Sequence, residues 1–145
     1  MGRRETVESL IATWRERLGL TDWDIRFSED KPDVDTRGTS DIWVYKRSGI
    51  IRIEPAAPDE VLEEVVVHEL LHFLLHGIKN AYDNIIPDVL SRREQAHLNE
   101  ATKDAEEVAI HHLTSAFLGR GVQCWEDDKW GHAFPVLKET TDATA

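Results

Sequence analysis

The longest apolar stretch of this chain, VVVHELLHFLLHG at residues 65–77, is interrupted by histidines and a glutamate. A helix formed by it is apolar almost all round and therefore belongs at the centre of a fold. The stretch is too short to cross a bilayer. We expect the helix to begin near Pro58 and to stop at Gly77, because proline suits a first helical turn and glycine a helix end. Ionisable side chains buried there cost free energy unless partners satisfy them.

The first two histidines of this stretch, His68 and His72, are four residues apart. A helix places them on one face, one turn apart, where their rings can meet at one point. With Glu69 they form the His-Glu-x-x-His pattern, in which two neutral imidazoles bind zinc and the carboxylate acts as a base. The alternative is a buried helix whose histidines only form hydrogen bonds within the core. Because the two histidines enclose a glutamate at this spacing, we favour zinc.

A catalytic zinc site needs a third protein ligand, and the segment 104–119, DAEEVAIHHLTSAFLG, offers candidates. Its helical apolar stripe runs through Ala105, Ala109, Leu113, Ala116 and Phe117. Glu106 lies beside that stripe and Glu107 lies nearly opposite to it. We therefore favour Glu106 as the third ligand, with Glu107 as the alternative. A solvated acidic pair without a ligand role is the third possibility.

The other histidines have less defined expectations. His76 continues the row of His68 and His72, but it lies about 12 Å along the helix axis from His68, too far to share one ion. It is expected to line the cleft or to cap the helix end. His111 or His112 could orient a ligand or stabilise an oxyanion. No role is assigned to His97 and His132.

The rest of the pattern predicts an α+β fold in one domain. In chain order we expect a helix over 4–19, a strand with Trp23, Ile25 and Phe27 on its buried face, strands around 41–46 and 49–54 joined by a turn at Ser48-Gly49, the central helix, and a helical region over 89–118. The three strands should form a small, mostly antiparallel sheet beside the N-terminal, central and long C-terminal helices. The domain is expected to span 1–137, followed by a disordered tail over 138–145.

Composition narrows the possible functions. The net charge is −11, which disfavours binding to the phosphate backbone of nucleic acids. We also expect no membrane segment and no secretory signal. The single cysteine, Cys124, cannot form an internal disulfide, which fits a reducing, cytoplasmic compartment. The sequence does not indicate an oligomeric state.

The segments IWVYKRSGIIRI, HELLH and EEVAIHHLTSAF, in this order, resemble the small gluzincin-type metallopeptidases, including proteins of phages and bacteria. The resemblance covers roughly residues 5–118 and implies a zincin-like fold. It also implies that His68, His72 and Glu106 (or Glu107) bind zinc and that Glu69 is the catalytic base. In such enzymes the strand before the motif helix borders the substrate cleft. Here that strand is 49–53, where an extended peptide could pair as an added strand.

Two other functions compete with a zinc-dependent peptidase acting on a peptide or protein substrate. In one, zinc joins the helices of a non-catalytic binding or regulatory module. Glu69 argues against that reading, because a purely structural zinc site does not need it. In the other, the chain is a helical interaction protein without a metal.

Overall fold

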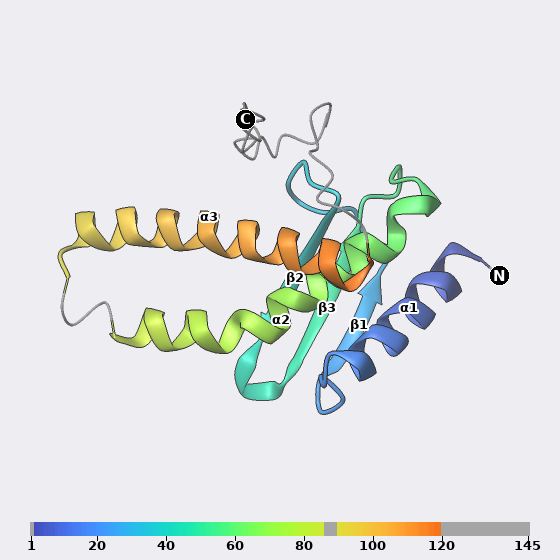
Figure 1. The fold of residues 1–145 in the computed structure, drawn as a ribbon, viewed down its shortest axis with the longest axis horizontal. Helices are drawn as coiled ribbons and strands as arrows, with labels where there is room; N and C mark the ends of the chain where they lie inside the picture. Colours follow the sequence, from blue (N-terminus) through green and yellow to red (C-terminus); the bar gives the residue numbers. More distant parts are fainter. Residues whose placement is uncertain (1, 86–89, 120–145) are drawn as a thin grey trace, which may run out of the picture.

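A computed structural model describes residues 2–85 and 90–119 of the chain, and it has an α+β fold (Figure 1). Its elements in chain order are α1 (Arg3–Arg17), β1 (Asp24–Ser28), β2 (Gly38–Trp43), the 3-10 turn η1 (Val44–Lys46), β3 (Ser48–Ile53), the 3-10 turn η2 (Asp59–Val61), α2 (Leu62–Ile85) and α3 (Arg92–Phe117). Three helices and a small three-stranded sheet were expected and are found. The predicted tail, 138–145, lies outside the described residues.

The sheet is mixed, which corrects the expectation of a mostly antiparallel one. Its strand order is β1-β3-β2, with β1 parallel and β2 antiparallel to β3. The loop after β1 carries the chain past the position that β3 later takes, so β2 forms an outer edge. The return strand β3 then inserts between β1 and β2. Strand β3 is therefore the centre of the sheet.

The turn between β2 and β3 also differs from the prediction. Strand β2 begins at Gly38 and ends at Trp43, so it lies about three residues before the expected strand 41–46. The chain turns through η1, after which Arg47 adopts a left-handed conformation (φ 45°). Gly49, expected in the turn, lies within β3. A Cβ atom there would lie 2.3 Å from Cε1 of Phe73, so its missing side chain lets α2 approach the sheet.

The hydrophobic core lies between one face of the sheet and the first two helices. Alternate residues of β3 are buried, and α1 and α2 pack against each other and against the strands. The buried apolar side chains are Val7, Ile11, Trp14, Leu20, Ile25, Ile51, Ile53, Ala57, Leu62, Val65, Val66, Val67, Leu70, Leu71, Phe73 and Ile110. Most of the list comes from α1, β3 and the first half of α2. The central helix of the sequence analysis is therefore central in the fold.

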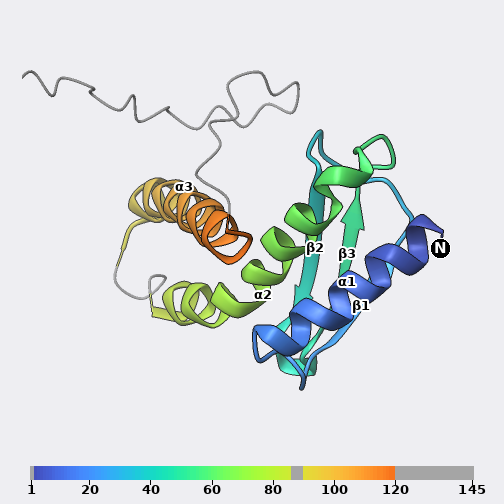
Figure 2. The same cartoon turned by 45° about the vertical axis from the view of Figure 1, so that its right-hand side comes forward.

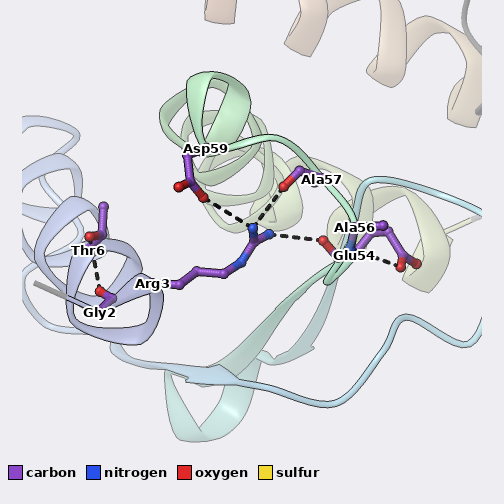
Figure 3. Close-up of polar contacts among 7 residues, drawn as sticks. All are labelled: Gly2, Arg3, Thr6, Glu54, Ala56, Ala57 and Asp59. Carbon is purple, nitrogen blue, oxygen red and sulfur yellow. Dashed lines mark hydrogen bonds and ion pairs between the residues drawn. The ribbon is translucent and has the colours of Figure 1, made fainter.

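Arg3 connects the start of α1 to the segment that leads into α2 (Figure 3). Its guanidinium group donates hydrogen bonds to the backbone oxygens of Glu54 and Ala57, at 3.0 and 2.8 Å, and contacts Asp59 Oδ1 at 3.3 Å. Glu54 and Ala57 follow β3, and Asp59 opens η2. These contacts satisfy carbonyl groups of a turn and fix where α2 begins relative to α1 and the sheet.

Helix α2 continues past Gly77 to Ile85, so the predicted stop is wrong. A glycine inside a helix costs stability but does not end it when the following residues continue the helical pattern. Beyond the sheet, α2 and α3 lie side by side and run in opposite directions (Figures 1 and 2). Among the described residues, no helix has the length and hydropathy of a membrane-spanning segment.

The buried face of α3 is not the predicted apolar stripe. Its buried residues are Ile110 and Thr114, whereas the stripe side chains are exposed, Leu113 by 36% and Phe117 by 48%. Glu107 lies on the Ile110 side of the helix, because residues three and seven positions later share its face. The inward face of α3 thus carries polar residues, and the face predicted from the hydrophobic stripe is wrong.

Candidate metal centre

His68 and His72 lie on successive turns of α2, where the helix passes the sheet. Their ring centroids are 5.1 Å apart at an interplanar angle of 67°. One ligand atom from each of His68, Glu69 and His72 lies within 4.8 Å of the others. The histidine side chains are 25% and 19% exposed, so they are shielded but still open to a ligand. The four-residue spacing therefore brings both imidazoles to one place, as expected.

Glu107 reaches this pair from α3. Its Oε2 atom lies 3.2 Å from Nε2 of His68, and its Oε1 atom lies 3.2 Å from Nε2 of His72. One carboxylate thus spans the Nε2 atoms of both rings. The two oxygens of this carboxylate each contact a different ring, and two imidazoles with one carboxylate are donor types found in many three-ligand zinc sites.

Glu106 contacts the opposite nitrogen of the second ring. Its Oε1 atom lies 3.1 Å from Nδ1 of His72. A carboxylate that accepts a hydrogen bond from Nδ1 leaves Nε2 as the nitrogen available to a metal, and it fixes the ring orientation. Both candidate glutamates of the sequence analysis therefore face the histidines, in different positions. Their arrangement favours Glu107 over Glu106 at the point where the two rings meet.

The charges of this cluster are strongly coupled. Burial alone would lower the pKa of His72, but hydrogen bonds with Glu106 and Glu107 and the charge of Glu69 raise it to about 10. The same contacts work in the other direction on the acids. Hydrogen bonding to His72 lowers the pKa of Glu106, and hydrogen bonds to His68 and His72 lower the pKa of Glu107 against the effect of burial. The cluster therefore favours a positive charge at its centre.

Glu69 is 4% exposed and lies under the edge strand β2. A Cβ atom at Gly38 would lie 2.9 Å from Oε1 of Glu69 and 2.7 Å from Cγ1 of Val65. Only a residue without a side chain lets β2 come this close to α2. Gly38 therefore sets the position of the strand above the carboxylate, a role that the sequence analysis missed and that no local pattern announced.

A pocket of about 410 Å³ opens over these residues, between β2, α2 and α3. It is lined by Thr36, Gly38, Thr39, Ser40, Ile42, His68, Glu69, His72, His76, Lys79, Lys103, Glu106 and Glu107. All four residues of the predicted site are in this set. Of the two expectations for His76, the first is confirmed, because this residue lines the pocket. The second is wrong, because α2 continues beyond His76 and the residue does not cap a helix end.

The strand that borders the pocket is β2, not the predicted 49–53. Strand β3 is hydrogen-bonded on both sides and has no edge for a peptide. On β2, the Arg37 carbonyl accepts a hydrogen bond from the Glu54 amide at the start of the ladder. In an antiparallel pair this bonding alternates, so Gly38, Ser40 and Ile42 direct their backbone groups to the open edge. Those three residues also line the pocket.

The remaining histidines are elsewhere. His111 and His112 contact each other, with ring centroids 6.4 Å apart, and neither they nor His97 line the pocket. His132 and Cys124 lie outside the described residues. Lys79 and Lys103 do line the pocket and were not singled out from the sequence. Lys103 precedes Glu107 by about one helical turn and shares its face of α3. A correct prediction of that face would therefore have pointed to Lys103 as well.

Comparison with protein-family models, with curated proteins and with solved structures found no match for this chain.

Proposed function

We propose that this protein is a zinc-dependent metallopeptidase with a zincin-like fold, in which Glu69 is the general base. The observation that carries the proposal is the convergence of the Nε2 atoms of His68 and His72 on one carboxylate of Glu107, 3.2 Å from each. This group lies at the wall of an open pocket that also contains Glu69. The position of Glu107, a residue of α3 outside the His-Glu-x-x-His motif, supports the proposal in addition to the motif.

Zinc fits the residues that are present. With neutral imidazoles, the cluster of Glu69, Glu106 and Glu107 carries three negative charges in a partly buried place. In the protein without metal, a proton on His72 compensates part of this charge, which is why the pKa of His72 is raised to about 10. A divalent cation at the Nε2 atoms would neutralise more of it. Nitrogen and carboxylate donors are a set that zinc accepts.

In the proposed site, His68, His72 and Glu107 hold the ion, and Glu106 orients His72 through Nδ1. The assignment of Glu106 as the direct ligand, favoured by the sequence, is the alternative. Glu107 is preferred because it alone contacts both Nε2 atoms. Glu106 reaches the nitrogen that points away from the shared point.

Bound zinc would supply Lewis acidity, polarising a peptide carbonyl and acidifying a water molecule. The chain's own groups do the rest. Glu69 accepts a proton from the attacking water and delivers it to the leaving amine. An extended peptide pairs with the open edge of β2 at Ser40 and Ile42, beyond Gly38, whose carbonyl already accepts a hydrogen bond from the Thr36 hydroxyl, and this pairing holds the peptide backbone over the site. The buried position of Glu69 under Gly38 fixes the base relative to that backbone.

One observation favours a second candidate, a zinc-stabilised binding module without catalysis. Within its described residues, α3 has only Ile110 and Thr114 buried, so a metal that joins Glu107 to α2 would do much to hold it in place. The presence of Glu69 and of an open pocket favours catalysis over this candidate.

The test combines metal content with one isosteric variant. The purified protein is expected to bind about one equivalent of zinc and to cleave a fluorogenic peptide pool. Glu69→Gln should retain the zinc and lose activity by about 10²–10⁴-fold, because the general base is lost. The matched control is Glu60→Gln, a change at an exposed position of η2 outside the pocket, and it should behave like the wild type.

Three results would overturn the proposal: no zinc in the wild type, hydrolysis unchanged in Glu69→Gln, or zinc bound without any cleavage of the pool. The last result, with the pocket occupied by a partner that remains intact, would establish the binding module.

A further inference from the structure

The pocket extends beyond the histidine pair to two lysines that the proposed reaction does not use. We propose that Lys79 and Lys103 bind a carboxylate of the peptide substrate, either an acidic side chain or its C-terminus, and so give the site a preference for anionic peptides. This inference rests on the proposed peptidase function and adds to it a class of substrate. Both lysines line the pocket, one from each of its two helices.

The two lysines lie on the same side of the metal centre. Lys79 follows His72 by seven residues on α2, about 10 Å along the helix axis, and Lys103 precedes Glu107 by four residues on α3, about 6 Å along it. Because α2 and α3 run in opposite directions, both displacements point toward the loop that connects these helices (Figure 1). The lysines thus form one cationic end of the pocket, a few residues of extended peptide from the reaction centre.

The packing of β2 against α2 shows which end of this strand lies nearer to the lysines. Gly38 lies against Glu69, whereas Gly49, which is paired with Ile42, lies against Phe73. The Ile42 end of β2 is therefore the end nearer to Lys79. A peptide on the β2 edge passes from the metal centre toward the lysines as it passes Ile42.

The ammonium groups of the two lysines are accessible to an anionic ligand. Both side chains are exposed, and neither forms an ion pair with a described residue. The positive charge of Lys79 contributes to the lowered pKa of Glu106, but no hydrogen bond or ion pair joins the two side chains. In a chain of net charge −11, whose pocket also contains three glutamates, two cations at one end are a local exception. They attract a carboxylate that the three glutamates of the pocket repel, which makes a selective contact.

The test measures peptide binding to the zinc-loaded Glu69→Gln protein, so that its outcome does not depend on cleavage. Three fluorescent peptide pools are compared: one with a fixed Asp or Glu and an amidated C-terminus, one without acids and with a free C-terminus, and a neutral amidated pool. At least one anionic pool should bind about tenfold more tightly than the neutral pool, and the preference should shrink at high salt. The pool that binds identifies the source of the carboxylate.

Charge reversal at the lysines supplies the decisive comparison. K79E/K103E, in the same background and with its zinc content verified, should lose the preference and bind Lys-containing peptides better. K46E/R93E makes the same change in net charge at exposed positions outside the pocket and should keep the preference. Equal binding of all three pools, or a preference that survives K79E/K103E, would overturn the inference. If no pool is cleaved by the wild type while the preference reverses as stated, the peptidase proposal fails and the anion site stands.

Discussion

The two halves of α2 form one continuous helix in very different surroundings. In the first half, up to Phe73, the buried residues are Leu62, Val65, Val66, Val67, Glu69, Leu70, Leu71 and Phe73. In the second half no described side chain is buried, and Leu74 and Ile78 are 44% and 65% exposed. The candidate metal centre lies at the border between the halves. The comparison indicates that the sheet fixes one wall of the site, while the second half of α2 and α3 add a wall that packing holds weakly.

The largest expected effect tests the packing difference directly. Leu70→Ala removes a side chain with no exposed surface and should lower the free energy of unfolding by about 2–5 kcal/mol. The same change at Leu74, in the outer half, should cost less than about 1 kcal/mol. Urea denaturation of both variants gives the numbers. Equal costs would break the distinction between the halves.

A second prediction concerns the hold of zinc on α3. Without zinc, amide hydrogens of α3 should exchange faster than those of β3, since α3 buries little. Zinc at a hundredfold excess over its Kd should stabilise the zinc-binding arrangement of α2 and α3 by about 2.7 kcal/mol and slow amide exchange in α3 by about a hundredfold.

The glutamate variants sharpen this prediction. Glu107→Gln should abolish the slowing at the same zinc concentration, because it removes a proposed ligand. Glu106→Gln should weaken zinc affinity by about 10–100-fold, the usual effect of losing a group that orients a ligand. If Glu106→Gln has the larger effect, the two roles must be exchanged.

The third prediction uses pH. In the metal-free protein, the pKa of His72 is raised from 6.5 to about 10, so its contribution to stability is complete below pH 6.5 and disappears as the pH rises toward 10. The lowered pKa values of Glu106 and Glu107 contribute above pH 4.5, their ordinary value, and are lost in acid. The contribution of the cluster is therefore greatest between pH 4.5 and 6.5.

Thermal unfolding over a range of pH measures this contribution. The wild type without metal should lose several degrees of Tm between pH 6.5 and 10 relative to His72→Gln, and saturating zinc should remove the loss because the ion replaces the proton. Parallel curves for the two metal-free proteins would contradict the charge coupling.

The smallest effect comes from one of two glycines, Gly77. Gly77→Ala, in the outer half of α2, meets no atom within 4 Å and should stabilise the protein by about 0.5–1 kcal/mol. Gly38→Ala, above the inner half, collides with Val65 and Glu69 and should destabilise the protein and reduce activity while zinc remains bound. A stabilising Gly38→Ala would show that the strand is not held against the carboxylate.

What the sequence predicted depends on the range of the interactions involved. The convergence of His68 and His72 follows from the helix itself, so four-residue spacing was sufficient. The central position of β3 depends on which strand returns beside β1, and no local pattern encodes that choice. The prediction of which face of α3 points inward was wrong, because the Ala and Leu stripe faces outward. Glu106, Glu107 and Thr114 lie on the packed side instead. Polar residues thus occupy the packed face, where the prediction relied on a hydrophobic pattern.

The unbroken course of α2 has a mechanical consequence. Because no break separates its halves, the helix that is buried against the sheet also carries Lys79. The spacing between His72 and Lys79, about 10 Å along the axis, is therefore set by the helix backbone itself. The distance from the histidine pair to this lysine is thus fixed by the hydrogen bonds of a single element, although the outer half buries no described side chain.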